Sequence, residues 1–195
     1  MLSLGACVVT REAFSLEQLK DRDLTFYAEL KPTSLQFVPM AVRVGASQLG
    51  ALKSSANTPS MYPTHSLFEA RKALRYLQDS DMCVLPETAM RTFAKWLENV
   101  GRFKNLVPVV DTTFFDSGWL NLYFARAEID SPLGHKGLDL TSFWKGASNN
   151  LGRSLNTVAV CCGDLVEHHA LYDAVHLARL TRTIFFEKLG FPVAT

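Results

Sequence analysis

Residues 24–31 alternate without a break between apolar and polar side chains, and this pattern limits the possible folds more than any other part of the sequence. The apolar positions are Leu24, Phe26, Ala28 and Leu30. A period of two places every second side chain on the same face, which is typical of a β-strand with one buried face. The earlier apolar run at residues 2–9 suits an antiparallel neighbour. The N-terminal region therefore predicts two paired strands.

Helical periodicity dominates most of the remaining chain. Residues 66–78, 86–101 and 168–189 carry apolar side chains at spacings of three and four, and Ser66 and Glu69 have capping-box spacing. Residues 105–110 are apolar and β-branched and predict a short buried strand. Strands that alternate with helices predict an α/β fold, with a mixed sheet flanked by helices. A chain of 195 residues that is 48% hydrophobic is predicted to form one domain, residues 1–195.

Charge and cysteine content limit the possible partners and compartments. Twenty Lys and Arg residues stand against nineteen Asp and Glu residues, so the net charge of +1 provides no long-range field for a polyanion or an anionic membrane. Any contact with nucleic acid must then be local. No stretch approaches the ~20 apolar residues of a membrane span. The cysteines, at positions 7, 83, 161 and 162, lack the spacing of a zinc site or a disulfide framework, which predicts free thiols and a cytoplasmic protein.

Two short motifs contain the candidate functional residues. The first, F-D-S-G-W-L at residues 115–120, lies where a predicted strand gives way to a predicted helix, the place where α/β folds hold ligands. The second, H-H-A-L-Y-D-A at residues 168–174, opens the last helix. Either motif alone has a structural interpretation. An Asp before a helix is commonly an N-cap, and Asp173 with His169 can form a simple surface pair.

Taken in order, the two motifs resemble the second and third motifs of the DEDDh exonucleases, a family that includes ribonuclease T, oligoribonuclease and the epsilon proofreading subunit of bacterial DNA polymerase. Residues 2–6 resemble the second strand of that family, and residues 26–32 and 39–45 resemble the region after its third strand. The resemblance implies an RNase H-like fold and a 3′–5′ exonuclease that acts on the 3′ end of single-stranded DNA or RNA. Relatives of this kind include homodimers.

The resemblance also implies a set of site residues. Asp116 and Asp173 would be metal ligands and His168 the general base. Phosphodiester hydrolysis by two metals requires carboxylates that hold two Mg²⁺ or Mn²⁺ ions about 3.5–4 Å apart. A histidine can accept a proton from water near neutral pH. Helix geometry favours His169 because it precedes Asp173 by four residues, whereas the family spacing favours His168, which is the preferred candidate.

The first motif of the family, a D-x-E pair on a strand, has no counterpart in the sequence. Leu2 already resembles the following strand, and the carboxylates at positions 12, 17, 21 and 23 lack the required spacing. In the family this strand is central, so the resemblance predicts a missing N-terminal central strand and two unpaired strand edges. It also predicts two metal-binding carboxylates of the usual four, and therefore impaired activity.

Three explanations of this departure remain open. In the preferred explanation, Met1 is an internal methionine of a longer reading frame, and the upstream codons encode the strand with D-x-E. In the second explanation the protein is a non-catalytic relative that binds a 3′ end or another protein, with an affinity for single strands that falls as salt rises. In the third, the chain is an α/β interaction domain whose motif match is accidental, and it binds neither metal nor nucleic acid.

Overall fold

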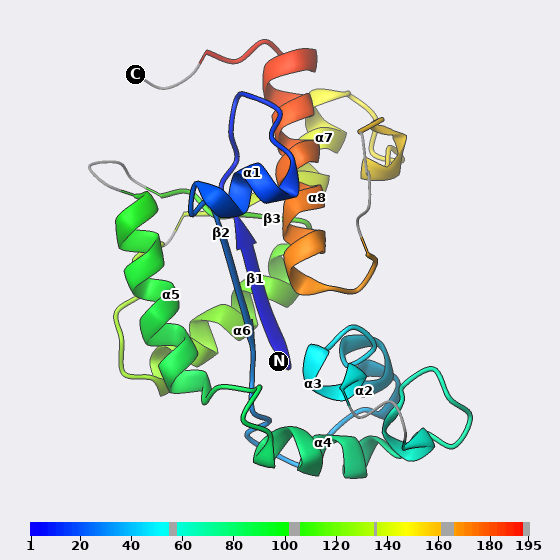
Figure 1. Ribbon diagram of the computed structural model, residues 1–195. Helices are drawn as coiled ribbons and strands as arrows, with labels where there is room; N and C mark the ends of the chain where they lie inside the picture. Colours follow the sequence, from blue (N-terminus) through cyan, green and yellow to red (C-terminus); the bar gives the residue numbers. More distant parts are fainter. Residues whose placement is uncertain (55–57, 102–105, 135, 161–165, 193–195) are drawn as a thin grey trace.

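The computed structural model describes residues 1–54, 58–101, 106–134, 136–160 and 166–192, with the backbone alone described at 113–115 (Figure 1). It has the mixed α/β composition that the sequence predicts. The strands are β1 (Ser3–Cys7), β2 (Thr25–Glu29), β3 (Val109–Val110) and β4 (Leu138–Asp139). The helices are α1 (Leu16–Asp21), α2 (Pro39–Gly45), α3 (Gly50–Lys53), α4 (Ala70–Asp79), α5 (Pro86–Val100), α6 (Thr113–Arg126), α7 (Leu140–Ala147) and α8 (Ala170–Arg182). Short 3₁₀ turns lie at Pro59–Met61 and Leu155–Thr157, and α8 continues as a π-helical segment, Thr183–Lys188.

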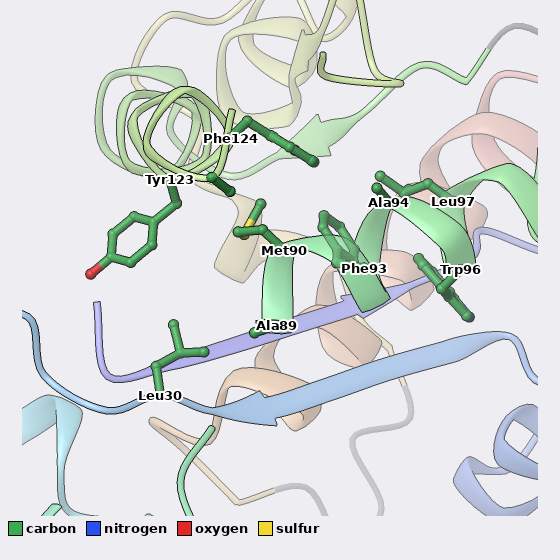
Figure 2. Packing of buried hydrophobic residues seen from close by; sticks show 10 residues of the cluster. Leu30, Ala89, Met90, Phe93, Ala94, Trp96, Leu97, Tyr123 and Phe124 are labelled. Atoms are coloured by element: carbon green, nitrogen blue, oxygen red, sulfur yellow. The ribbon is translucent and has the colours of Figure 1, made fainter. Parts of the chain in front are cut away.

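The antiparallel pair of β1 and β2, which the alternation predicts, lies between two layers of helices. Gly5 is opposite Tyr27 in the register. On one face Phe26 contacts α5, with its ring centroid 5.0 Å from that of Phe93, and Figure 2 shows the buried side chains of α5 and α6 on this side of the strands. On the other face α8 lies so close that a Cβ at Gly5 would overlap the backbone of Ala170. Glycine therefore permits the contact between β1 and α8.

The second pair of strands, β3 and β4, is parallel and much shorter. Val109 is opposite Leu138, and Val110 is opposite Asp139. The strand predicted at 105–110 is reduced to two residues within the described chain, and Pro108, which has no N–H to donate, accepts the N–H of Leu138 at 2.9 Å. Within the described residues, the pair β1–β2 and the pair β3–β4 are two separate sheets.

Two local predictions differ from the structure. The helix predicted to begin at Ser66 begins at Ala70, because the carbonyl of His65 accepts the N–H of Phe68 at 3.2 Å and its Nδ1 accepts the N–H of Leu67 at 3.1 Å. These bonds hold residues 65–68 in a turn, so the predicted capping box was wrong. A true capping box lies at the N-terminus of α1, where Ser15 and Gln18 exchange hydrogen bonds of 2.9 and 3.2 Å.

Two of the four cysteines lie in the described residues, and both are free thiols. Cys83 is buried, and Cys7 is half-buried, with burial raising the pKa of its thiol to about 12. The two adjacent cysteines at positions 161 and 162, also predicted to be free thiols, lie outside the described residues. None of the helices in the described ranges has the length and apolar character needed to cross a membrane.

Candidate active site

The start of α8 carries three of the residues that the sequence singles out. His169 is the N-cap, because its Nδ1 accepts the N–H of Leu171 at 3.2 Å. Asp173 lies in the first turn and donates its own N–H to the carbonyl of His169 at 2.9 Å. His168 precedes the helix in a left-handed conformation, with φ of 62°. Non-glycine residues adopt this conformation rarely, and such positions cluster at functional sites.

His168 and Asp173 are close neighbours although five residues separate them. The backbone N–H of His168 lies near enough to the carboxylate of Asp173 to lower its pKa. Partial burial raises the pKa of Asp173, and the imidazole of His168 gives the largest opposing effect, with smaller ones from His169 and His176. Inside a regular helix a spacing of five would turn His168 away from Asp173. The left-handed turn before the helix brings the two residues together instead.

His169 has a different environment from its neighbour. Its ring stacks on Tyr27 with centroids 4.6 Å apart and an interplanar angle of 24°. Burial lowers the pKa of its imidazole, and the charge of Lys53 lowers it further, while Glu29 opposes the shift. One ring nitrogen is already the cap of α8. His169 is therefore a neutral structural residue that joins the start of α8 to β2.

Asp116 lies in the first turn of α6, shortly after β3. The N-cap of α6 is Thr112, whose side chain makes no cap hydrogen bond, so the N-cap interpretation of Asp116 is wrong. Burial raises the pKa of Asp116, and so does the nearby carboxylate of Asp111. A second acidic residue thus accompanies Asp116.

The sequence motifs do not include Asp111, although it lies beside a candidate ligand. It directly follows β3, and its Oδ1 accepts the hydroxyl of Thr141 at 2.6 Å. Its position could have been recognised, because the carboxyl ends of parallel strands are where α/β folds place their ligand-binding side chains.

The structure thus brings the candidate residues together in two groups. His168, His169 and Asp173 form one group, and Asp116 lies with Asp111 in the other. In the ranges that the structure describes, no three His, Cys, Asp or Glu side chains converge as a metal-binding set.

Comparison with known proteins finds a similarity to an exonuclease. No family model matches the chain. A 3′–5′ DNA exonuclease from Escherichia coli, Cap18, is 29% identical to it over 189 residues, which cover 94% of this chain and 81% of that protein. The resemblance to 3′–5′ exonucleases is confirmed. The similarity supports an exonuclease function in the broad sense.

A metal-dependent exonuclease would need side chains that bind cations and a side chain that accepts a proton, and the two groups contain side chains of both types. Carboxylate oxygens are the hard ligands that Mg²⁺ and Mn²⁺ prefer. A bound cation would relieve the repulsion between the carboxylates of Asp111 and Asp116. His168 is exposed beside Asp173, and its imidazole is the type of side chain that commonly serves as a general base. The donor chemistry therefore fits a divalent cation, although a complete set of ligands for two ions requires more carboxylates than these.

Proposed function

We propose that the chain is a metal-dependent 3′–5′ exonuclease that removes nucleotides from the 3′ end of single-stranded DNA. The start of α8 carries this proposal, because His168 is exposed beside Asp173 in a chain similar over 94% of its length to a DNA exonuclease. DNA is the preferred substrate because that relative is an exonuclease of DNA. Residues 1–195 act as one domain in this proposal.

Each residue has a specific role in the proposed reaction. Asp116 and Asp173 would hold Mg²⁺ or Mn²⁺, which when bound activates water and stabilises the leaving oxygen. His168 accepts the proton of the attacking water, and the adjacent carboxylate of Asp173 stabilises the cationic imidazole that results. His169 does not take this role, because its Nδ1 is the cap of α8.

We further propose that the two small sheets are halves of one RNase H-like sheet, with an additional strand between β1 and β3. The antiparallel pairing of β1 with β2 and the parallel pairing of β3 with β4 support this arrangement. A D-x-E pair on the additional strand would supply the carboxylates that the two described groups lack. The 195 residues alone should then release nucleotides slowly.

The test is the Mn²⁺-dependent release of nucleotides from an oligonucleotide labelled at its 5′ end. We expect progressive shortening from the 3′ end, abolished in Asp173→Asn and unchanged in the control Asp21→Asn, which alters an exposed carboxylate on α1. His168→Ala should lower the rate about 10²–10⁴-fold, the usual contribution of a general base. His169→Asn, which keeps a capping side chain, should retain the rate. Equal turnover in wild type and Asp173→Asn would refute the proposal.

A non-catalytic relative that binds nucleic acid is the second candidate. The observation that favours it is that the described side chains do not assemble three metal ligands. This candidate predicts binding of a single strand with no release of nucleotides in Mn²⁺, even after a strand with D-x-E is fused before Leu2. Restored turnover in that fusion would instead support the exonuclease with an incomplete site.

A further inference from the structure

The charge of residues 31–78 differs from that of the rest of the chain. This segment contains six basic residues and one acidic residue, Glu69, whereas the rest has fourteen basic and eighteen acidic residues. The basic positions are Lys31, Arg43, Lys53, Arg71, Lys72 and Arg75. The overall charge of +1 therefore conceals a local excess of +5. A local positive field attracts a polyanion even where the whole molecule is nearly neutral.

A groove lies in this basic segment, between the start of α2 and the start of α4. Its volume is about 450 Å³, and the residues that matter for its chemistry are Phe37, Met40, Arg43, Phe68, Glu69 and Arg71. The helix α4 contacts both α2 and α3, and in Figure 1 it lies at the bottom of the molecule with these two helices above it on the right. Met40 is 66% exposed. The lining of the groove thus combines apolar side chains with two arginines and one glutamate.

The groove contains two pairs in which an arginine lies over an aromatic ring. The guanidinium carbon of Arg43 is 5.2 Å from the ring centroid of Phe68, and that of Arg71 is 6.0 Å from the centroid of Phe37. Both rings are only partly buried. Unpaired bases stack on aromatic rings and on guanidinium planes, while guanidinium groups also pair with phosphates. Two such pairs in one groove match a chain of alternating bases and phosphates.

We propose that this groove binds single-stranded DNA. Phe37 and Phe68 supply stacking surfaces, and Arg43 and Arg71 contact phosphates. The excess of positive charge favours a nucleic acid over an apolar protein segment as the occupant. The identity of the strand as substrate rests on the proposed exonuclease function, whereas the binding itself does not.

Neutralisation of Glu69 should change DNA binding in the opposite direction to neutralisation of the arginines. Glu69 is the one acidic residue of the segment, and it lies in the groove. Its carboxylate repels phosphate, so its neutralisation should strengthen binding while neutralisation of either arginine should weaken it. A groove that binds an apolar partner has no reason to respond with these two signs.

The experiment is fluorescence anisotropy with a 5′-fluorescein oligothymidylate, in EDTA so that the probe stays intact. Arg43→Ala and Arg71→Ala should each lower the slope of log affinity against log salt by about 0.7, the value for one phosphate contact with a single strand. Phe37→Leu keeps the apolar volume and should weaken binding about 5- to 100-fold, as expected for one lost stacking contact. Glu69→Gln should bind more tightly. The control Lys95→Ala, which removes an exposed charge on α5, should bind as the wild type does.

The results separate this proposal from the exonuclease proposal. If Arg43→Ala and Arg71→Ala keep the wild-type affinity and salt slope while circular dichroism shows normal folding, the groove proposal fails whatever the nuclease assay gives. The same holds if the wild type does not bind the probe. If the wild type binds through the groove but releases no nucleotide in Mn²⁺ with or without the added strand, the exonuclease proposal fails and the groove proposal stands.

Discussion

The two small sheets differ in the length of their strand pairing and in the helices that cover them. The strands β1 and β2 pair over five residues and are covered on one face by α5 and on the other by α8. The strands β3 and β4 pair over two residues and lead within a few residues into α6 and α7. The first sheet supports the group at His168 and Asp173, and the second supports Asp116. The two candidate carboxylates therefore lie beside different sheets, although α6, which carries Asp116, also packs on α5.

The helix α8 connects the first region, built around β1 and β2, with the second region, built around β3, β4 and α7. The start of α8 lies against β1. Its later residue Leu180 and Ile184 of the π-helical segment belong to a buried cluster with Leu140 and Trp144 of α7. Val109 of β3 packs against this second cluster. The first group is thus positioned by the direct packing of α8 on β1, whereas the second is positioned by α6, which packs on α5, and by the hydrogen bond of Asp111 with Thr141 of α7.

The largest expected effect distinguishes the cores of the two regions. Phe93 is 3% exposed and contacts Phe26 and Trp96, so Phe93→Ala should lower the free energy of unfolding by about 3–5 kcal/mol. Phe143, which lies on α7 against Phe185, is only half-buried, and Phe143→Ala should cost clearly less. Urea unfolding of both variants measures the difference. Equal losses would show that the second region is as tightly packed as the first.

The next effect compares one substitution at two glycines. Gly5→Ala places a Cβ against the backbone of Ala170 and should cost about 2–3 kcal/mol, because neither backbone can move freely. Gly118 lies inside α6, and a Cβ added there would meet no heavy atom within 4 Å, so Gly118→Ala should raise stability by about 0.5–1 kcal/mol. Thermal unfolding should therefore give shifts of opposite sign. Two shifts of the same sign would contradict the close contact of β1 with α8.

The parts that the sequence predicts well are those in which one periodicity covers a whole element. The alternation at 24–31 places β2, and the apolar stripe at 168–189 places α8 together with its π-helical continuation, which ends shortly before Gly190, with φ of 64°. These patterns suffice because one regular period of apolar side chains meets a buried layer along each element, although the second face of the β1–β2 pair is also covered, by α8. The mixed α/β class follows from them.

The parts that the sequence does not predict depend on contacts between distant or irregular residues. The start of α4 is decided by the turn at His65, and the pairing of β3 is shortened next to Pro108. The nearness of His168 to Asp173 depends on one left-handed residue, which no periodicity encodes. The roles of Asp116, Asp173 and His168 remain predictions that the nuclease assay has to test.

A smaller effect tests how the second region is held together at its strand ends. Asp139 is the N-cap of α7 and accepts the N–H of Ser142 at 2.7 Å, so Asp139→Ala should lower stability by about 1 kcal/mol. Asp139→Asn keeps a capping oxygen and should recover most of this loss. The urea midpoints of the three proteins at one pH measure both effects. If the Asn variant is no more stable than the Ala variant, the cap is not what stabilises the junction.

The smallest effect concerns pH and belongs to the first region alone. Burial lowers the pKa of His169 below that of an unfolded histidine, about 6.5, so the unfolded chain binds a proton more readily than the folded one. His169 therefore contributes stability above pH 6.5 that is lost as the pH falls through its folded pKa. His169→Asn retains a capping side chain but cannot titrate. The urea midpoint should then fall less between pH 7.5 and pH 5.5 in this variant than in the wild type. An equal fall in both proteins would mean that the imidazole is as accessible to protons in the fold as in the unfolded chain, and that α8 is held less firmly on β2 than its stacking on Tyr27 implies.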